Sequence, residues 1–174
     1  MSTAYPWCEP PFPEKELPRE ELEDRIQELL GHVNTMVMAT INKAGKPIAS
    51  PIEFYADGLD LYCLPDPGTP KLAAMQRDPN ICCAIHMPYH GWQSGRGAQF
   101  FAQVEIIEPH ATGWDHGMEI FKWQPWMEDL GMDTSKPFER QIAKIVPDKI
   151  LYTDVWLWKR GFHAKQVWKS EDAT

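Results

Sequence analysis

The chain has 174 residues, of which 43% are hydrophobic and 24% are charged, and its formal net charge is −8 at pH 7. This composition is typical of an ordinary globular domain and excludes an intrinsically disordered chain. The negative charge argues against nonspecific partners such as nucleic acid or an anionic membrane, because both are polyanions.

The N-terminal region, residues 1–17, is predicted to be an extended arm. It holds Pro6, Pro10, Pro11 and Pro13, and proline lacks the amide hydrogen and fixes φ. The arm has neither the basic flank nor the apolar core of a signal peptide. No stretch of the chain approaches the roughly 20 apolar residues that span a bilayer. We therefore expect a cytoplasmic protein with no membrane partner.

Residues 18–31 are predicted to form a helix, and a single domain is expected from residue 18 to residue 174. The apolar residues of this segment recur at helical spacing: Leu22, Ile26, Leu29 and Leu30. Acidic residues occupy its first turns, and Gly31 offers a C-cap.

After this helix the pattern becomes that of an antiparallel sheet. Three β-prone runs, separated by turns, cover residues 35–41, 46–55 and 61–64. A short helix is predicted over residues 69–77, with Thr69 as its N-cap and Pro70 at its first position. Further strands are predicted over residues 81–87 and 98–107.

The last third of the chain is predicted to be helical over residues 110–143 and to return to β structure over residues 144–158. Breaks in the helical part are expected near Pro125, Gly131 and Pro137. The element order predicts a mainly β fold, an antiparallel barrel with peripheral helices at its rim.

The metal-ligating and nucleophilic residues form no motif that we can identify. Cys8, Cys63, Cys82 and Cys83 lack zinc spacing and are interpreted as buried structural thiols. The six histidines also lack the helical spacing of a catalytic zinc site. We therefore predict no metal site, and the sequence does not identify which residues are catalytic.

Residues 61–71 contain the most informative pattern. A strand leads through Gly68 into a helix that begins with Thr69 and Lys71. Free backbone amides at the helix start, a hydroxyl and an ammonium together suit a phosphate group. The alternative, on these residues alone, is an ordinary N-cap beside a solvent-facing lysine.

The order and spacing of several segments resemble the pyridoxamine 5′-phosphate oxidase superfamily. The matching stretches, within residues 33–108, are Met38-Ala39-Thr40-Ile41-Asn42, Gly45-Lys46-Pro47, Ser50-Pro51, Leu61-Tyr62-x-Leu64-x-Asp66-Pro67-Gly68-Thr69-x-Lys71 and Arg77-Asp78-Pro79-Asn80-Ile81. The resemblance implies an antiparallel split β-barrel that binds FMN at the interface of a homodimer. The FMN phosphate is then expected near the Gly-Thr-x-Lys turn and the ring along the second strand.

The resemblance also implies which residues contact the cofactor. These are Ser50, Pro51, Ile52, Leu64, Pro65, Thr69, Lys71 and Gln99. Near the C-terminus, Trp158 is a candidate to stack on the flavin of the partner subunit, with Lys159 or Arg160 close to it. The alternative for this segment is an edge strand that carries surface cations. Trp92 is a further aromatic candidate.

The sequence departs from the family pattern in its cations. Pro70 replaces the arginine of the usual Ser-Arg-Lys triplet, and Ser50 and Tyr55 replace an arginine and a lysine of the true oxidases. We expect weaker phosphate binding, or substitution by Arg96, Lys159 or Arg160. A true pyridoxamine phosphate oxidase is not expected.

The leading functional hypothesis is an FMN-dependent oxidoreductase acting on a small organic substrate or a nicotinamide. The alternatives are a noncatalytic flavin-binding or sensing protein, and a protein that binds haem or a deazaflavin on the same fold.

Overall fold

The computed structural model describes residues 12–88, 90–91, 95–135 and 138–171. Residues 12–17 of the predicted arm contain no regular element. The predictions for Cys8, Trp92 and Pro137 lie outside the described residues.

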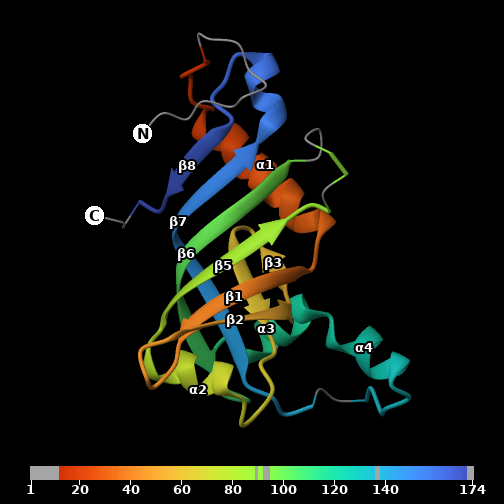
Figure 1. The fold of residues 1–174 in the computed structure, drawn as a ribbon. Coiled ribbons are helices and arrows are strands. Elements are labelled where there is room, and N and C mark those ends of the chain that lie inside the picture. Colours follow the sequence, from red (N-terminus) through yellow and green to blue (C-terminus); the bar gives the residue numbers. More distant parts are fainter. Residues whose placement is uncertain (1–11, 89, 92–94, 136–137, 172–174) are drawn as a thin grey trace.

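Strands dominate the described part of the chain and form one antiparallel sheet. They are β1 (Thr35–Ile41), β2 (Pro47–Glu53), β3 (Tyr55–Asp57), β4 (Asp60–Cys63), β5 (Asn80–His86), β6 (Arg96–Ile107), β7 (Ile142–Asp154) and β8 (Lys165–Lys169). Their order is β2-β1-β5-β6-β7-β4-β3, and β8 pairs with β7. The sheet curls into a half-barrel, which confirms the predicted mainly β split-barrel fold (Figure 1).

The longest strand pair, β6 with β7, contains a register shift. Phe101 of β6 pairs with Lys149, whereas Ala102 pairs with Pro147, so Asp148 is an extra residue in β7. The buried positions of β7 therefore change parity at this bulge. On one side of it β7 pairs with β4, and on the other side it pairs with β8.

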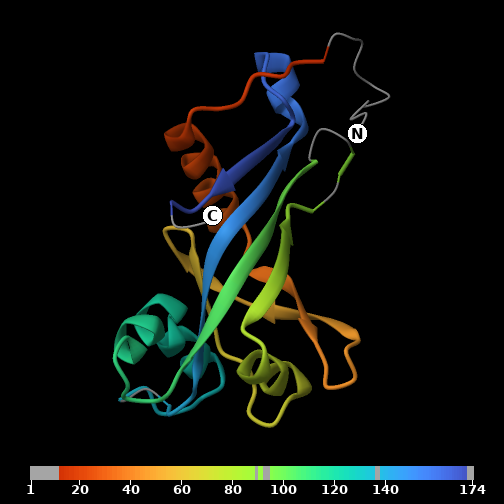
Figure 2. The same cartoon turned by 90° about the vertical axis from the view of Figure 1, so that its left-hand side faces the viewer.

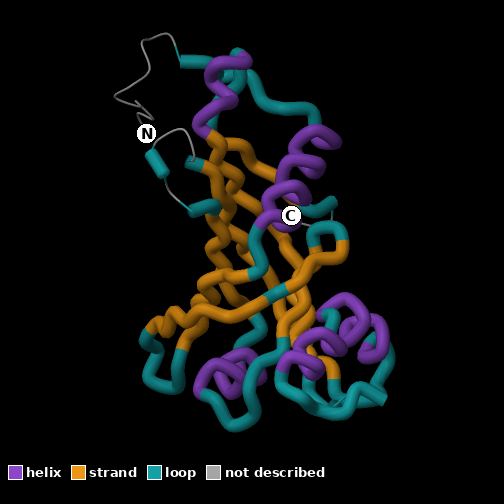
Figure 3. Tube along the Cα trace, turned by 90° about the vertical axis from the view of Figure 1, so that its right-hand side faces the viewer, coloured by secondary structure: helices purple, strands orange, loops and turns teal. Residues whose placement is uncertain are grey.

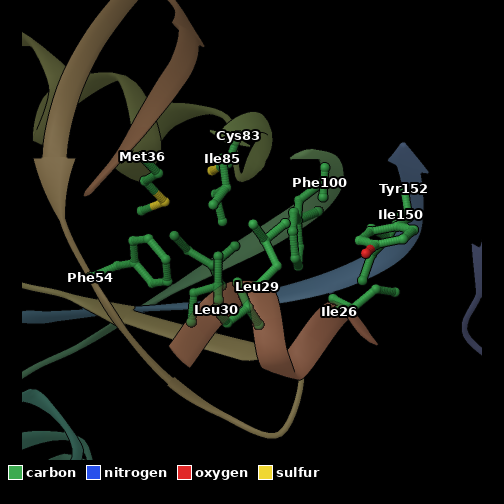
Figure 4. Close-up of a cluster of buried hydrophobic side chains, with 14 of the residues drawn as sticks. Ile26, Leu29, Leu30, Met36, Phe54, Cys83, Ile85, Phe100, Ile150 and Tyr152 are labelled. Carbon is green, nitrogen blue, oxygen red and sulfur yellow. The ribbon is translucent and has the colours of Figure 1, made fainter. Parts of the chain in front are cut away.

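The helix α1 (Arg19–His32) covers the inner face of the curled sheet, and its four predicted apolar residues are all buried. Figure 4 shows Ile26, Leu29 and Leu30 of this helix facing side chains from several strands. The burial of this apolar face gives α1 its stability, because a helix of this length is marginal by itself. None of the described helices has the length and apolar character needed to cross a membrane.

The helices α3 (Trp114–Phe121) and α4 (Trp123–Asp129) lie next to one another at the lower end of the molecule in Figure 3. Their buried residues form one cluster with Tyr62 of β4 and Ile142 of β7. Gly117 permits this packing, because a Cβ there would lie 2.8 Å from Cδ1 of Ile142. The helix α2 (Pro70–Arg77) follows β4 and lies at the same end (Figure 2).

Four local predictions were wrong. The predicted helical region 110–143 contains α3 and α4, but α4 ends at Asp129 and the strand β7 begins at Ile142. Gly31 is not a C-cap, since α1 continues through it to His32 and ends in the extended residue Val33. The predicted strand 46–55 is two strands, β2 and β3, and the turn follows at residues 58–59. The predicted strand 144–158 ends at Asp154.

The last of these corrections has a clear cause. The side chain of Asp154 accepts a hydrogen bond from the backbone amide of Trp156 at 2.9 Å. This bond caps a 3-10 helix, η2 (Val155–Arg160), in place of further strand. The interpretation of residues 156–160 as an edge strand is therefore wrong, and β8 was not predicted.

Candidate functional site

The start of α2 has the capping geometry that its sequence predicts. The backbone amide of Leu72 donates to Oγ1 of Thr69 at 3.4 Å, and Oγ1 donates to the backbone carbonyl oxygen of Asp66 at 2.8 Å. Gly68 has a φ of +74°, which the tight turn requires and which favours glycine. Pro70 occupies the first turn, where its missing amide hydrogen costs nothing.

Lys71 joins this helix start to the second strand. Its side chain is half-buried, and Nζ donates a hydrogen bond to the backbone carbonyl oxygen of Pro51 on β2 at 3.3 Å. The two segments in which the sequence predicts the phosphate and the ring of a cofactor are therefore in direct contact.

A pocket of about 250 Å³ lies at this junction. It is lined by Pro51, Ile52, Glu53, Leu64, Asp66, Lys71, Phe121, Trp126, Phe138 and Arg140. Four of the predicted site residues are among them: Pro51, Ile52, Leu64 and Lys71. The structure therefore places around one pocket four of the eight residues, Trp158 not counted, that the family resemblance predicts to contact the cofactor.

The remaining wall of the pocket comes from segments that contain none of the predicted cofactor-binding residues. Phe121 ends α3, Trp126 lies on α4, and Phe138 precedes β7. The rings of Trp126 and Phe138 are 5.4 Å apart at a tilt of 34°. This wall is apolar and aromatic, which suits a planar ring.

Arg140 is the second cation of the pocket and was missed by sequence reasoning. Its Nη2 donates to Oδ1 of Asp66 at 2.6 Å. The indole Nε1 of Trp114 donates to its backbone carbonyl oxygen at 2.7 Å and so holds the segment in place. No local motif marks this arginine, because its proximity to Lys71 depends on the packing of α3 against the sheet.

Three other predicted residues do not line the pocket as described. Ser50 pairs with Met38, whose side chain faces the core, and so lies on the opposite face of β2 from Pro51. Pro65 is buried. Thr69 uses its hydroxyl to cap α2.

Gln99 lies on the outer face of the sheet, away from this pocket. It belongs to a row of directly paired residues that crosses six strands: Pro51, Val37, Ala84, Gln99, Leu151 and Val167. Paired residues of antiparallel strands share a face, so one row connects Gln99 with Pro51 at the pocket. Gln99 also lines a shallow groove of about 590 Å³ at the β8 side of this face.

Trp158 lies on η2, at the opposite end of the molecule from α2 (Figures 1 and 2). One chain therefore does not bring Trp158 to its own pocket. Two of the cations expected to assist are paired with α1: Arg96 with Glu28 at 2.8 Å and Arg160 with Glu21 at 2.7 Å.

A larger cleft, of about 720 Å³, lies between α1 and α3. Its polar lining includes His32, Asn34, His116 and Lys122. None of the predicted site residues contributes to it. It is therefore not the site that the sequence pattern predicts.

The described cysteines have the character of structural thiols. Burial raises the pKa of Cys63 to about 12 and also raises the pKa of Cys83. Thiols that remain protonated at neutral pH are poor nucleophiles and poor metal ligands. Within the described ranges, no group of three or more His, Cys, Asp or Glu residues is placed to hold a metal ion.

The family model described as "Pyridoxamine 5'-phosphate oxidase" matches residues 22–154. This range includes β1 to β7 and the whole pocket. The chain belongs to the pyridoxamine 5′-phosphate oxidase family. The comparison with curated proteins finds no match.

Solved structures share the fold of this oxidase family member at low sequence identity. A Listeria innocua protein provisionally named a pyridoxamine 5′-phosphate oxidase is 22% identical, with a TM-score of 0.61 over 75% of this chain and 97% of that one. A FAD-binding protein of Mesorhizobium loti is 14% identical, with a TM-score of 0.58 over 78% and 92%. The haem storage protein HutZ of Vibrio cholerae is 16% identical, with a TM-score of 0.59 over 72% and 89%.

The names of these proteins refer to different ligands. Membership of the pyridoxamine 5′-phosphate oxidase family and the shared fold therefore do not select a ligand for this chain. The choice depends on the pocket residues.

Proposed function

We propose that this chain binds FMN in the pocket between β2 and α2 and acts as an FMN-dependent oxidoreductase. The observation that carries the proposal is the contact between Lys71 and the Pro51 carbonyl oxygen. It places a cation and a helix start beside a pocket that also has an aromatic wall of Phe121, Trp126 and Phe138. The cation suits the anionic end of a flavin nucleotide, and the aromatic wall suits its planar end.

The residues fit the phosphate end of FMN within one chain. Thr69 already caps the Leu72 amide and Pro70 has no amide hydrogen, so α2 offers a phosphate mainly the partial positive charge of its N-terminal end. Lys71 adds an ammonium at the same place. A phosphate monoester carries about −1.5 to −2 charges at neutral pH, so both contributions favour it.

The ring end of FMN requires more surface than one chain offers. A pocket of about 250 Å³ is smaller than most cofactor sites. The outer row of the sheet continues from Pro51 and exposes large apolar side chains, with Val37 at 40% and Val167 at 50% exposure. Ala84, Gln99 and Leu151 lie between these two valines in the row. Exposed apolar side chains on one sheet face favour an interface. We therefore propose a homodimer across this face, with the flavin at the interface, near Gln99.

We propose that in such a dimer the η2 end of one copy lies at the pocket of the other copy, where Trp158 stacks on the flavin. The ring has partial burial and its indole nitrogen makes no hydrogen bond within the described residues.

Bound FMN supplies hydride and electron transfer, so the chain's own residues need only bind, orient and shield it. The substrate that this pocket suits is a small organic molecule or a nicotinamide. Pro70, Ser50 and Tyr55 stand where the true oxidases place cations, so vitamin B6 phosphate oxidation is not proposed.

The absorption spectrum of the freshly purified protein tests this proposal. We expect flavin bands, release of FMN on acid denaturation, and bleaching by NADH or NADPH in the absence of oxygen. A haem or deazaflavin spectrum would contradict FMN binding and identify one of the alternative ligands. Flavin bands without bleaching by either nicotinamide would favour the noncatalytic alternative.

A further inference from the structure

Arg140 and Asp66 form an ion pair at the mouth of the same pocket. The Nη2–Oδ1 distance is 2.6 Å. The two partners differ in environment, since the arginine side chain is 25% exposed and the aspartate side chain is 79% exposed. An exposed carboxylate is held weakly by such a pair, so Asp66 can leave Arg140 at little cost.

The guanidinium has an unused donor. Nε of Arg140 is buried and makes no hydrogen bond within the part of the chain that the structure describes. A buried donor without a partner is unfavourable and calls for an explanation. A guanidinium binds phosphate through two parallel donors, whereas Asp66 engages Nη2 alone.

The charges around the pocket are balanced without a ligand. Lys71 and Arg140 are its cations, and Glu53 and Asp66 are its anions. Glu53 already accepts hydrogen bonds from the Tyr55 hydroxyl at 3.0 Å and from the Asn34 side-chain amide at 3.2 Å. Asp66 is therefore the acidic group that an incoming anion has to displace.

From these contacts we propose that Arg140 is the second phosphate-binding cation of this site and that Asp66 competes with the phosphate for it. This inference rests on the proposed function, because FMN is the phosphate monoester in question. On binding, the guanidinium exchanges the carboxylate for the phosphate and engages it through two donors. Arg140 thereby performs the task of the arginine that Pro70 replaces in the family pattern.

The test compares FMN with riboflavin, which has the same ring and no phosphate, by titration of flavin fluorescence. Arg140→Gln should weaken FMN binding about 10- to 100-fold, the effect of losing one charged hydrogen-bonding group. It should change riboflavin binding less than about twofold. Asp66→Asn should tighten FMN binding about two- to fivefold, since it removes the competing carboxylate. The melting temperature of each variant shows whether it folds.

Arg19→Gln is the matched control, because Arg19 also forms an ion pair at the surface, with Glu23 at 2.9 Å. It should leave FMN binding unchanged. The inference is overturned if Arg140→Gln weakens FMN and riboflavin equally, or if only Arg19→Gln weakens FMN.

If the wild-type protein binds neither flavin, the proposed function fails separately. Thermal stabilisation by pyrophosphate then decides the inference. Stabilisation of the wild-type protein that Arg140→Gln loses supports an anion site at Arg140, and no difference between them overturns it.

Discussion

Arg96 on β6 reaches across to Glu28 on α1, with an Nη2–Oε2 distance of 2.8 Å. The same guanidinium donates through Nε to the hydroxyl of Tyr152 at 2.8 Å and through Nη2 to the backbone carbonyl oxygen of Arg25 at 2.9 Å. The Arg96 side chain therefore links α1 to β6 and β7, two strands in the middle of the sheet. Its role in stability can be separated from any role in ligand binding.

The first prediction concerns acid stability. The hydrogen bond from Arg96 holds the pKa of Glu28 below its usual value. A carboxylate with a lowered pKa in the folded state stabilises the fold above the ordinary glutamate pKa of about 4.3, and this contribution disappears as the pH falls through the folded-state pKa. Glu28→Gln should therefore lower the free energy of unfolding at pH 7 but make little difference near pH 3.

Urea unfolding at several pH values measures this effect. Glu20→Gln, on the exposed surface of the same helix, is the control. Its free energy of unfolding should differ from that of the wild type by the same amount at each pH. A deficit of Glu28→Gln that stays constant from pH 7 to pH 3 would contradict the assignment.

The second prediction concerns Lys71. Lys71→Ala should reduce the flavin content of the purified protein strongly, because it removes an ammonium from the proposed phosphate site. The free energy of unfolding without ligand should change by less than about 1 kcal/mol, since the lost hydrogen bond is single and partly exposed. Lys43→Ala, in the exposed turn before β2, should change neither. Full flavin occupancy in Lys71→Ala would remove Lys71 from the site.

The third prediction uses two glycines with opposite surroundings. A Cβ on Gly97 would lie 2.8 Å from the backbone carbonyl oxygen of Ile85, so Gly97→Ala should destabilise the fold by about 1–3 kcal/mol. A Cβ on Gly31 would meet nothing within 4 Å, and this residue is helical. Gly31→Ala should stabilise the fold by up to about 1 kcal/mol. Chemical denaturation of both variants checks the pair, and equal effects of the same sign would be inconsistent with it.

The fourth prediction concerns the proposed dimer. Val37→Lys places a charge on the outer row of the sheet, and in a symmetric dimer it brings two like charges toward one interface. We expect a monomer by light scattering and reduced flavin content. Leu130→Lys is the control, because Leu130 is also exposed, at 56%, but is the C-cap that follows α4. A dimer that survives Val37→Lys, or that is disrupted by Leu130→Lys, would place the interface elsewhere.

Local sequence patterns were sufficient for elements whose cause is local. The spacing of Leu22, Ile26 and Leu29 predicts the buried face of α1, and Thr69 caps α2 as its position before Pro70 indicates. The order of motifs also brought Pro51, Leu64 and Lys71 into one prediction. The structure places these three around a single pocket.

The strand β8 shows where periodicity fails. Its buried positions are Gln166 and Trp168, whereas the apolar Val167 faces outward. Gln166 can be buried because it accepts a hydrogen bond from the Leu17 amide at 2.9 Å and donates to the His163 carbonyl oxygen at 2.6 Å. The Leu17 amide is distant along the chain, so a polar residue buried against it gives no periodic signal.

The sequence by itself determined the family, the strand-rich fold and the lysine at the start of α2, because these depend on residues that are neighbours along the chain. Only the tertiary structure decided that Arg140 and Trp126 share a pocket with Lys71, and that Gln99 and Trp158 lie elsewhere in the same chain. The physical reason is that these relations depend on the packing of α3 and α4 against the sheet and on strand pairing. Such long-range contacts arise from the burial of apolar surface, which no short stretch of sequence encodes alone.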